Sequence, residues 1–366
     1  MDGWRVALLY NLKRNAPVER GAPPDALAEY DCEETAEGIA AALRAAGHWV
    51  IRLEADTTLL DTIRQLQVDI CFNIAEGHRG DARESQVPAL LEMLGIPYTG
   101  SKVLAHALSL DKAMAKRIWR DNGLPTAPFQ VFRTGDERLD PSLRFPLFVK
   151  PLLEGSGKGI NRSSIVHTPA ELRRQVRWIL RTYRQPALVE AFLPGREFTV
   201  GLIGNRRRPG DPPRSPFYDA DGFHVFPILE IDLSPIPEAG GVYDSHVKSD
   251  LPLGPNYRCP APIDPALAAE MKRLAVAAFE AIGALDLARV DFRLGSDGRP
   301  YLLEINTLPG LNPTYSDIVL AARAEGVPYE RLIQEVLLLA AERYGMVRAP
   351  GAAVPVPVAA GACDGA

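Results

Sequence analysis

The chain has 366 residues, more than a single hydrophobic core usually serves, so two or three domains are expected. Its 46% hydrophobic and 24% charged residues are typical of a soluble globular protein. A net charge of −5 and a pI of about 5.8 exclude a broad basic surface for nucleic acid or an anionic membrane. Arg206–Arg208 and Arg214 lie among prolines and glycine, which predicts a solvated loop.

The cysteine pattern and the apolar runs set further limits. Cys32, Cys71, Cys259 and Cys363 show no close spacing, which argues against a zinc site or a disulfide framework and fits a reducing cytosol. The first residues lack an apolar signal core, and no apolar run reaches membrane-spanning length. We therefore expect a cytoplasmic protein without a membrane or nucleic-acid partner.

In chain order, the first segments alternate between apolar strands and a helix. Strands are expected at residues 5–10, 48–53 and 68–74, with a helix at 33–46 between the first two. This order indicates a parallel sheet with helical crossovers, an α/β arrangement.

Helices are next expected at 86–94 and 112–122, and Gly123 and Pro125 end the second of them. Short strands and separate helices follow, which is typical of α+β units. We predict an N-terminal α/β domain at residues 1–124, a central unit at 125–204 and a C-terminal unit at 205–347. A disordered tail of Ala, Gly, Pro and Val is expected at 348–366.

A hairpin near the C-terminal end carries charge where a core strand should be apolar. Asp297-Gly298 is a strong signal for a two-residue turn. A turn centred there places Asp291 opposite Glu304 and Arg289 opposite Asn306. Because side chains alternate along a strand, one face is expected to hold Arg289, Asp291, Leu302, Glu304 and Asn306, and the other face Val290, Phe292, Leu303 and Ile305.

The two opposed acids predict a metal site. Carboxylates that face each other across strands repel, at a cost of roughly several tenths of a kcal/mol or more. A cation between Asp291 and Glu304 removes that cost, and carboxylate and Asn306 oxygens suit Mg²⁺, which also takes phosphate oxygens. The alternative is a solvated outer face with a chance acid pair, which leaves the apolar character of both strands unexplained.

A second group of candidates surrounds a glycine-rich segment. Lys150 ends a buried strand, where a lysine is costly unless an anion meets it. The segment Gly155–Gly159 (GSGKG) lets the backbone approach a ligand, and with Lys150 it suggests a mobile flap over phosphates. Alone, the segment is equally typical of a flexible turn, and it matches no Walker A or dinucleotide motif. Three further candidates are Lys112 at a helix start and Glu190 and Glu197 on strands. Taken singly, each is also consistent with an ordinary surface charge.

Together these segments resemble the ATP-grasp superfamily, and within it the D-alanine–D-alanine ligases. The resemblance covers about residues 68–345. Arg289–Phe292 (RVDF) and Tyr301–Gly310 (YLLEINTLPG) are highly specific in combination. The other carriers are Phe72–Ile74, Gly95–Ser101, Asp111-Lys112, Phe148–Pro151, Glu154–Ser156 and Glu197–Val200. The resemblance implies a three-domain ATP-grasp architecture, with a parallel-sheet domain before two ATP-grasp units.

The resemblance also implies residue roles. On the nucleotide side it implies that Lys112 and Lys150 bind the phosphates and that Glu197 binds the ribose. The adenine edge would be formed by Glu190, Phe192 and Leu193. Lys248 would be one further lysine on this side. It implies two Mg²⁺ ions, with Mn²⁺ as a substitute, held by Asp291, Glu304 and Asn306. Arg289 would stabilise a tetrahedral intermediate, Gly310 would donate to its oxyanion, and Ser156 is the serine that remains in the flap.

The departures from the family pattern lie on the substrate side. Gly157 and Lys158 replace two flap residues, and Ser249 stands where members often have tyrosine. The hydroxyl-rich stretch that binds the second substrate's carboxylate reads Leu311–Ser316 (LNPTYS) here. The added charge of Lys158 and His246 favours a larger or more acidic substrate. Candidates for holding the first amino group are Glu29, Glu33 and Glu34.

The charged loop at 76–84 follows the third strand, where open α/β sheets bind ligands, so we interpret it as a substrate loop, with a solvated loop as the alternative.

The resemblance implies an ATP-dependent carboxylate–amine ligase that acts through an acyl phosphate on small amino-acid-like substrates, in peptidoglycan biosynthesis and as a homodimer. Alternatives are a ligase of the same fold for other amino acids or a metabolite acid, a kinase-like phosphotransferase, and a nucleotide-binding protein without catalysis.

Overall fold

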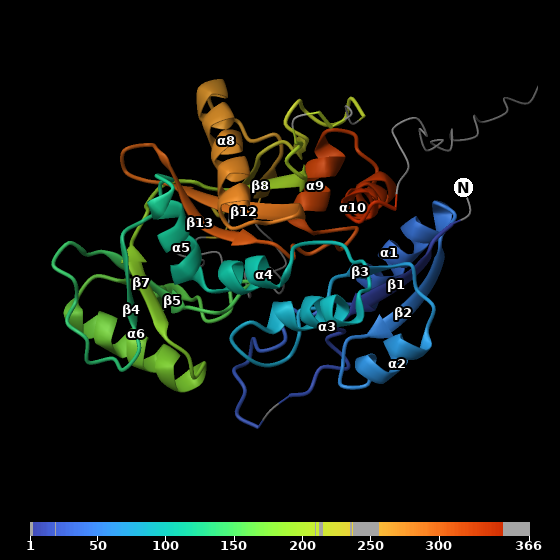
Figure 1. Ribbon diagram of the computed structural model, residues 1–366. Coiled ribbons are helices and arrows are strands. Elements are labelled where there is room, and N and C mark those ends of the chain that lie inside the picture. Colours follow the sequence, from blue (N-terminus) through green and yellow to red (C-terminus); the bar gives the residue numbers. More distant parts are fainter. Residues whose placement is uncertain are drawn as a thin grey trace, which may run out of the picture.

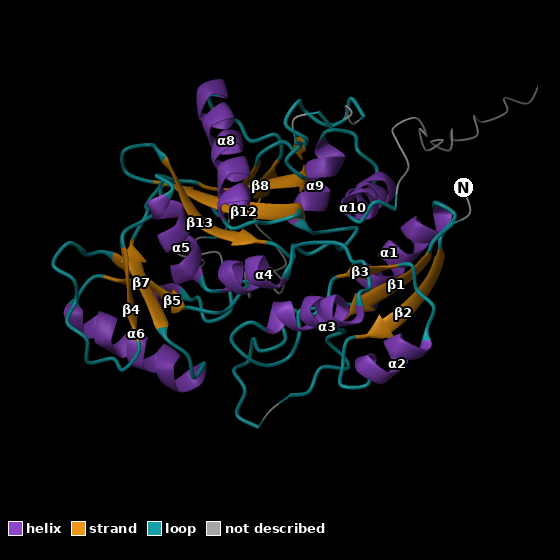
Figure 2. Cartoon of the chain, viewed as in Figure 1, coloured by secondary structure: helices purple, strands orange, loops and turns teal. Residues whose placement is uncertain are grey.

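The computed structural model describes residues 3–18, 20–208, 210–211, 215–234, 236 and 256–346. Three separate sheets organise this part of the chain (Figures 1 and 2). Lys248, His246, Ser249 and the tail predicted at 348–366 lie outside the described residues. None of the described helices is both long and apolar enough to cross a lipid bilayer.

The N-terminal sheet is parallel, as predicted. Its order is β2-β1-β3, with β1 (Arg5–Tyr10) paired to β2 (Trp49–Glu54) and to β3 (Ile70–Asn73). The burial of β1 is nearly complete, which fits an apolar central strand covered on both faces. The helices of this part are α1 (Glu33–Ala45), α2 (Leu59–Gln65), η1 (Arg83–Ser85), α3 (Gln86–Leu94), α4 (Val103–Leu110) and α5 (Lys112–Asp121).

The second sheet is small and antiparallel. Its order is β4-β7-β5-β6, formed by β4 (Phe129–Phe132), β7 (Ala187–Ala191), β5 (Leu147–Pro151) and β6 (Ile165–Val166). Helix α6 (Pro169–Thr182) buries Leu172, Val176 and Ile179 in one core with strand residues of this sheet. A short helix η2 (Arg162–Ser164) precedes β6.

The third sheet is the largest and carries the hairpin. Its order is β11-β10-β8-β12-β13, with β9 added to β8. The strands are β8 (Glu197–Gly204), β9 (Phe223–Val225), β10 (Leu229–Asp232), β11 (Asn256–Arg258), β12 (Asp286–Leu294) and β13 (Pro300–Asn306). The last helices are α8 (Pro265–Ala281), α9 (Asp317–Ala324) and α10 (Tyr329–Arg343). Strand β8, which the boundary at residue 204 assigns to the central unit, pairs with β12 in this sheet; the domain division itself stays a prediction.

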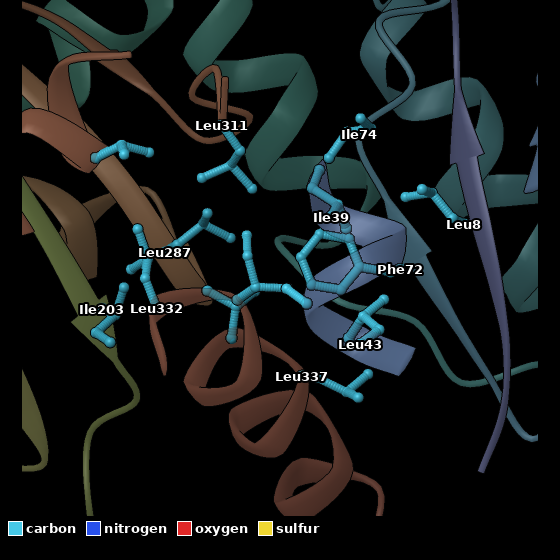
Figure 3. Close-up of a cluster of buried hydrophobic side chains, with 14 of the residues drawn as sticks. Leu8, Ile39, Leu43, Phe72, Ile74, Ile203, Leu287, Leu311, Leu332 and Leu337 are labelled. Atoms are coloured by element: carbon cyan, nitrogen blue, oxygen red, sulfur yellow. The ribbon is translucent and has the colours of Figure 1, made fainter. Parts of the chain in front are cut away.

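One core joins the N-terminal sheet to the third sheet (Figure 3). Leu43 and Phe72 from the N-terminal part lie in the same buried cluster as Leu332 and Leu337 of α10. Ile203 of β8 completes this cluster from the third sheet. Burial of this kind contributes about 25 cal/mol per Å² of apolar surface, so the two parts are held together by packing and not by a linker alone.

The β12–β13 hairpin has the predicted pairing at the acids. Asp291 lies opposite Glu304, and Arg289 lies opposite Asn306. The predicted two-residue turn is wrong, because Gly295 and Arg299 close a three-residue loop with a backbone hydrogen bond of 2.9 Å. The longer turn shifts the pairing by one residue, and a bulge after Asp291 shifts it back by one. The predicted pairing of Asp291 with Glu304 is therefore still formed.

The same bulge exchanges the faces of two leucines. Phe292 pairs with Leu302, which leaves Leu303 as the extra residue of β13. Leu302 is fully buried in the core with Val290, whereas Leu303 lines the cavity that also contains Asp291. The predicted faces of Leu302 and Leu303 are therefore wrong, because that prediction assumed an unbroken alternation of two along β13.

Candidate active site

Two adjoining cavities lie between the second and third sheets and the N-terminal part. The first has about 990 Å³ of empty space and the second about 2750 Å³, counting their open mouths. They share Lys112, Ser156, Ile160, Arg289, Glu304 and Asp317 in their walls. Every predicted site residue within the described part of the chain lines one or both of them: Lys112, Lys150, Ser156, Glu190, Phe192, Leu193, Glu197, Arg289, Asp291, Glu304, Asn306 and Gly310.

The opposed acids are held by neutral and cationic donors. Asp291 accepts hydrogen bonds from Thr199 Oγ1 at 2.6 Å, from Asn306 Nδ2 at 3.2 Å and from Arg289 Nε and Nη2 at 2.9 and 2.7 Å. Thr199 lies opposite Asp291 on β8, so three neighbouring strands fix this carboxylate. The carboxylate therefore keeps one orientation, as a metal ligand requires.

The pKa values of the two acids shift in opposite directions because their partners differ. Burial raises the pKa of Asp291, and Glu304 adds to the rise although Arg289 opposes it. Burial would raise the pKa of Glu304 as well, but Lys112, Lys150 and Arg289 lower it to about 2. A cation bound between the two acids would favour the ionised form of both.

The donor set fits Mg²⁺ only with help from a ligand. In the described part of the chain, no three His, Cys, Asp or Glu side chains are grouped as a metal site. Asp291, Glu304 and Asn306 therefore offer two carboxylates and one amide oxygen, which are hard oxygen ligands. Mg²⁺ commonly uses one or two carboxylates and completes its octahedron with waters and phosphate oxygens, so a phosphate-bearing substrate suits this partial set.

Two lysines, Lys112 and Lys150, line the first cavity, and Lys116 lies next to them outside its lining. Lys112 at the start of α5 lies 3.3 Å from Glu304, and its Nζ also donates to the carbonyl of Glu154. Lys150 at the end of β5 pairs with Glu190 at 2.9 Å. Lys116, one helical turn after Lys112, binds the other oxygen of Glu190 at 3.0 Å. The helical spacing from Lys112 is a signal by which sequence reasoning could have found Lys116.

A short loop after β7 forms the far wall of the first cavity. Phe192 and Leu193 line it, and the guanidinium of Arg293 lies 5.3 Å from the centre of the Phe192 ring. Arg293 also pairs with Glu197 at 3.2 Å. Burial raises the pKa of Glu197 against the opposing effect of Arg293. Apolar side chains beside a carboxylate are typical of a purine and ribose site.

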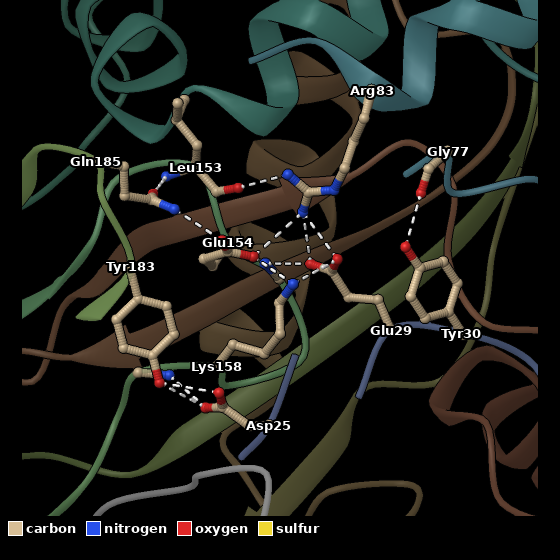
Figure 4. Close-up of polar contacts among 12 residues, drawn as sticks. Asp25, Glu29, Tyr30, Gly77, Arg83, Leu153, Glu154, Lys158, Tyr183 and Gln185 are labelled. Atoms are coloured by element: carbon tan, nitrogen blue, oxygen red, sulfur yellow. Dashed lines mark hydrogen bonds and ion pairs between the residues drawn. The ribbon is translucent and has the colours of Figure 1, made fainter. Parts of the chain in front are cut away.

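The glycine-rich flap, residues 154–159, is closed onto the N-terminal part (Figure 4). Glu29 accepts hydrogen bonds from Lys158 Nζ at 2.8 Å, from the Gly155 amide at 2.6 Å and from Arg83 Nη2 at 2.8 Å. A Cβ added at Gly155 would lie 2.8 Å from the Glu29 carboxylate, so a side chain there would displace that carboxylate. Glu154 forms a second ion pair with Lys158.

A second contact fixes the other end of the flap. Asp25 accepts hydrogen bonds from the Gly159 amide at 2.8 Å and from the Tyr183 hydroxyl at 2.8 and 2.9 Å. Of the three glutamates considered for the first amino group, Glu29 lines the second cavity but is already bound by Arg83 and Lys158. The charge of Lys158 is thereby neutralised, so the described residues do not favour the acidic substrate inferred from it.

The segment after β13 forms another part of the wall of the second cavity. Gly310 is exposed there, and a Cβ added to it would lie 3.0 Å from Ser316 Oγ. Asp317 at the start of α9 approaches Arg289 with an Oδ2–Nη1 distance of 3.2 Å. Burial acts against the charge of Arg289, but Asp291 and Asp317 outweigh it and raise its pKa.

Sequence reasoning missed Thr199, Arg293 and Asp317. The first two had a usable signal, since Arg293 shares the alternation of Arg289 and Asp291, and Thr199 lies in the segment Glu197–Val200. Asp317 had none, because only the chain path after Gly310 brings it to Arg289.

Comparisons with known proteins agree with this arrangement. The family described as D-ala D-ala ligase C-terminus matches residues 118–338. An uncharacterized protein, y4sG of Sinorhizobium fredii, is 37% identical over 93% of this chain and 98% of its own length. The D-alanine–D-alanine ligase of Pelotomaculum thermopropionicum is 32% identical over 86% of this chain and 93% of its own.

Solved structures show the same fold. The D-alanine–D-alanine ligase of Bacillus anthracis, in a crystal structure of its complex with ATP, superimposes with a TM-score of 0.70 at 20% identity, over 94% of this chain and 99% of that one. A second structure of that enzyme gives a TM-score of 0.69 at 21% identity. The chain therefore belongs to the D-alanine–D-alanine ligase family and has its ATP-grasp fold.

Proposed function

We propose that the protein is an ATP-dependent ligase that joins a carboxylate to an amine through an acyl phosphate. The observation that carries the proposal is the position of Arg289, Glu304 and Lys112 in the wall that the two cavities share. One cavity can hold the nucleotide and the other the acid and the amine, with the reacting phosphoryl group between them.

The first cavity would hold ATP. Phe192, Leu193 and Glu197 would bind the base and the ribose, and Lys112 and Lys150 would bind the phosphates. Lys150 keeps its charge although it is buried, since Glu190 and Glu304 outweigh burial and raise its pKa. Fixed cations in a water-poor site stabilise the charge that spreads over a transferring phosphoryl group.

Asp291, Glu304 and Asn306 would hold Mg²⁺ together with phosphate oxygens. When bound, the ion would neutralise phosphate charge and align the γ-phosphate with the acid. The residues of the chain do the rest: Thr199 and Arg289 fix the orientation of Asp291, and Lys112 keeps Glu304 ionised. A cytoplasmic location fits a reaction that consumes ATP, and the homodimer stays a prediction.

The chemistry proceeds in two balanced steps. A carboxylate oxygen attacks the γ-phosphorus, the bond to ADP breaks, and an acyl phosphate forms. The amine nitrogen then attacks the acyl carbon, the bond to phosphate breaks, and the nitrogen loses a proton. Arg289 would stabilise the tetrahedral oxyanion, helped by the backbone at Gly310, and the closed flap with Ser156 would keep water from the acyl phosphate.

Hydroxylamine tests this proposal without knowledge of the amine, because it converts an acyl phosphate into a stable hydroxamate. Purified protein is incubated with ATP, Mg²⁺, hydroxylamine and a panel of D- and L-amino acids and small carboxylic acids, with D-alanine first. ATP-dependent hydroxamate with at least one acid is expected. A phosphorylated product that hydroxylamine does not trap would instead indicate the kinase-like alternative, and the role in peptidoglycan biosynthesis requires D-alanine as substrate.

A further inference from the structure

The second cavity is rich in carboxylates and poor in cations. Among the residues that the structure describes, its walls contain seven acids, Asp25, Glu29, Asp31, Glu76, Glu84, Glu304 and Asp317, against the cations Lys13, Lys112 and Arg289. Two of these cations are paired with acids and the third is exposed: Lys112 is paired with Glu304, Arg289 lies between two carboxylates, and Lys13 is exposed to solvent. A substrate carboxylate would therefore meet no unpaired buried cation among the described residues of this wall.

Asp317 is the acid with unused binding capacity next to the reaction centre. Its side chain is 3% exposed, and one oxygen, Oδ2, binds Arg289. The other oxygen, Oδ1, is buried and has no hydrogen-bond partner among the described residues. A buried carboxylate oxygen without a donor is energetically costly, and the fold keeps this unsatisfied acceptor in the wall that both cavities share.

The hydroxyls beside Asp317 are used within their own loop. Ser316 Oγ accepts from the Asn312 amide at 2.8 Å, and Thr314 Oγ1 donates to Asn312 Oδ1 at 2.6 Å. Asn312 in turn donates from Nδ2 to Thr35 Oγ1 at 3.1 Å. The polar side chains of Asn312, Thr314 and Ser316 therefore hold the shape of this loop. The loop itself, residues 311–316, contains no lysine or arginine.

Two further acids that line this cavity, Glu76 and Asp31, form no ion pair with a cation among the described residues. Glu76 has no hydrogen bond or ion pair among the described residues, and burial together with Glu84, Glu29 and Asp31 raises its pKa well above the ordinary value. Burial also raises the pKa of Asp31 to about 7. A nearby cation favours the ionised form of a buried acid, so binding of a cation would release protons here.

We infer that the amine substrate is a cation at a second position: a diamine or an aminoalkyl guanidine, whose free cationic group contacts Asp317 Oδ1 while its other nitrogen attacks the acyl carbon. The inference rests on the proposed ligase function and narrows it to a substrate class. Asp317 selects this substrate, and the repulsion between Asp317 and an α-carboxylate disfavours an ordinary amino acid as the second substrate.

The test compares two amines of the same length. With the acid identified by hydroxamate formation, kcat/KM is measured for 1,4-diaminobutane, for n-butylamine and for D- and L-amino acids. The diamine is expected to exceed n-butylamine by about 10- to 100-fold, the range for one charge-assisted contact. Asp317→Asn should reduce this ratio towards one, and Glu76→Gln provides a second variant. Asp121→Asn, the same change on an exposed helix end, should leave the ratio unchanged.

The outcomes separate the two proposals. Equal rates with both amines, a preference for amino acids, or an Asp317→Asn variant that slows all amines by one factor would overturn the inference, while hydroxamate formation would still support a ligase. Absence of hydroxamate with every acid would overturn both. A direct readout accompanies the kinetics: 1,4-diaminobutane should raise the Tm of the wild-type protein, and n-butylamine or the Asp317→Asn variant should show no such shift.

Discussion

Lys150 approaches Glu190 to 2.9 Å in the interior of the second sheet, where neither side chain is more than 5% exposed. Lys116 binds the same carboxylate from α5, but it does not line either cavity, and burial lowers its pKa. Glu190 therefore joins a lysine that faces the first cavity to a lysine that does not. This difference separates a role in ATP binding from a role in structure.

The two lysines should respond differently to the same substitution. Lys150→Met is expected to raise the KM for ATP and lower hydroxamate formation by about 100-fold or more, because a phosphate-neutralising charge is lost. Lys116→Met should mainly lower Tm, since Glu190 keeps Lys150 as a partner. Initial rates at varied ATP and thermal melts of both variants check this. Equal losses of activity at equal Tm would contradict it.

Removal of either opposed acid should stop turnover without unfolding the protein. Asp291→Asn and Glu304→Gln each take away a predicted Mg²⁺ ligand, and a loss of about 10³-fold or more in phosphate release is expected. Arg289 keeps Asp317 as a partner in the first variant, so Tm should change little. Asp297→Asn, the same change in the exposed turn of this hairpin, is the control and should retain activity. Full activity of Asp291→Asn would refute the metal assignment.

Arg289 cannot be replaced by lysine without loss. Its Nε and Nη2 bind both oxygens of Asp291 while its Nη1 faces Asp317, a geometry that a single ammonium does not reproduce. Arg289→Lys is expected to lower kcat by about 10²- to 10³-fold, the cost of losing an oxyanion donor, with the KM for ATP unchanged. Hydroxamate yield at saturating ATP measures this. A change confined to KM would place Arg289 on the nucleotide side instead.

Glu29 should give the protein an acid-sensitive flap. Burial alone would raise its pKa, but Arg83, Lys158 and the Gly155 amide lower it from about 4.5 to about 2. A lowered pKa contributes stability above the unfolded pKa of about 4.5, and this contribution, roughly 3 kcal/mol, is lost as pH falls towards 2. Denaturant unfolding between pH 7 and pH 3 should show this decline in the wild type.

Glu29→Gln should be less stable at pH 7 by about 3 kcal/mol, because Arg83 and Lys158 lose a buried partner, and its acid decline should be shallower. Glu33→Gln serves as the matched control, since Glu33 also pairs with two arginines, Arg14 and Arg52, but its own side chain is 43% exposed, so the change should cost less than about 1 kcal/mol. A Glu29→Gln variant with wild-type acid sensitivity would refute this role.

Much of the fold and of the candidate site follows from local patterns. Alternating strands and helices predict the parallel N-terminal sheet, since a parallel strand requires a crossover. The pairing of Asp291 with Glu304 follows from the Asp297-Gly298 turn signal, although the turn has one residue more and a bulge compensates for it. Family resemblance adds the nucleotide-side residues, which carry recognisable sequence neighbours.

The tertiary structure alone decides the contacts between distant segments. Leu303 faces the cavity because a bulge breaks the alternation, and a bulge depends on the pairing of two strands and not on either sequence. Lys158 is neutralised by Glu29, 129 residues away, and Asp317 reaches Arg289 only through the path of the chain after β13. Two opposite charges neutralise each other only when they lie close together in space. The sequence therefore determined which charges are present, and the fold decided which of them stay available to a substrate.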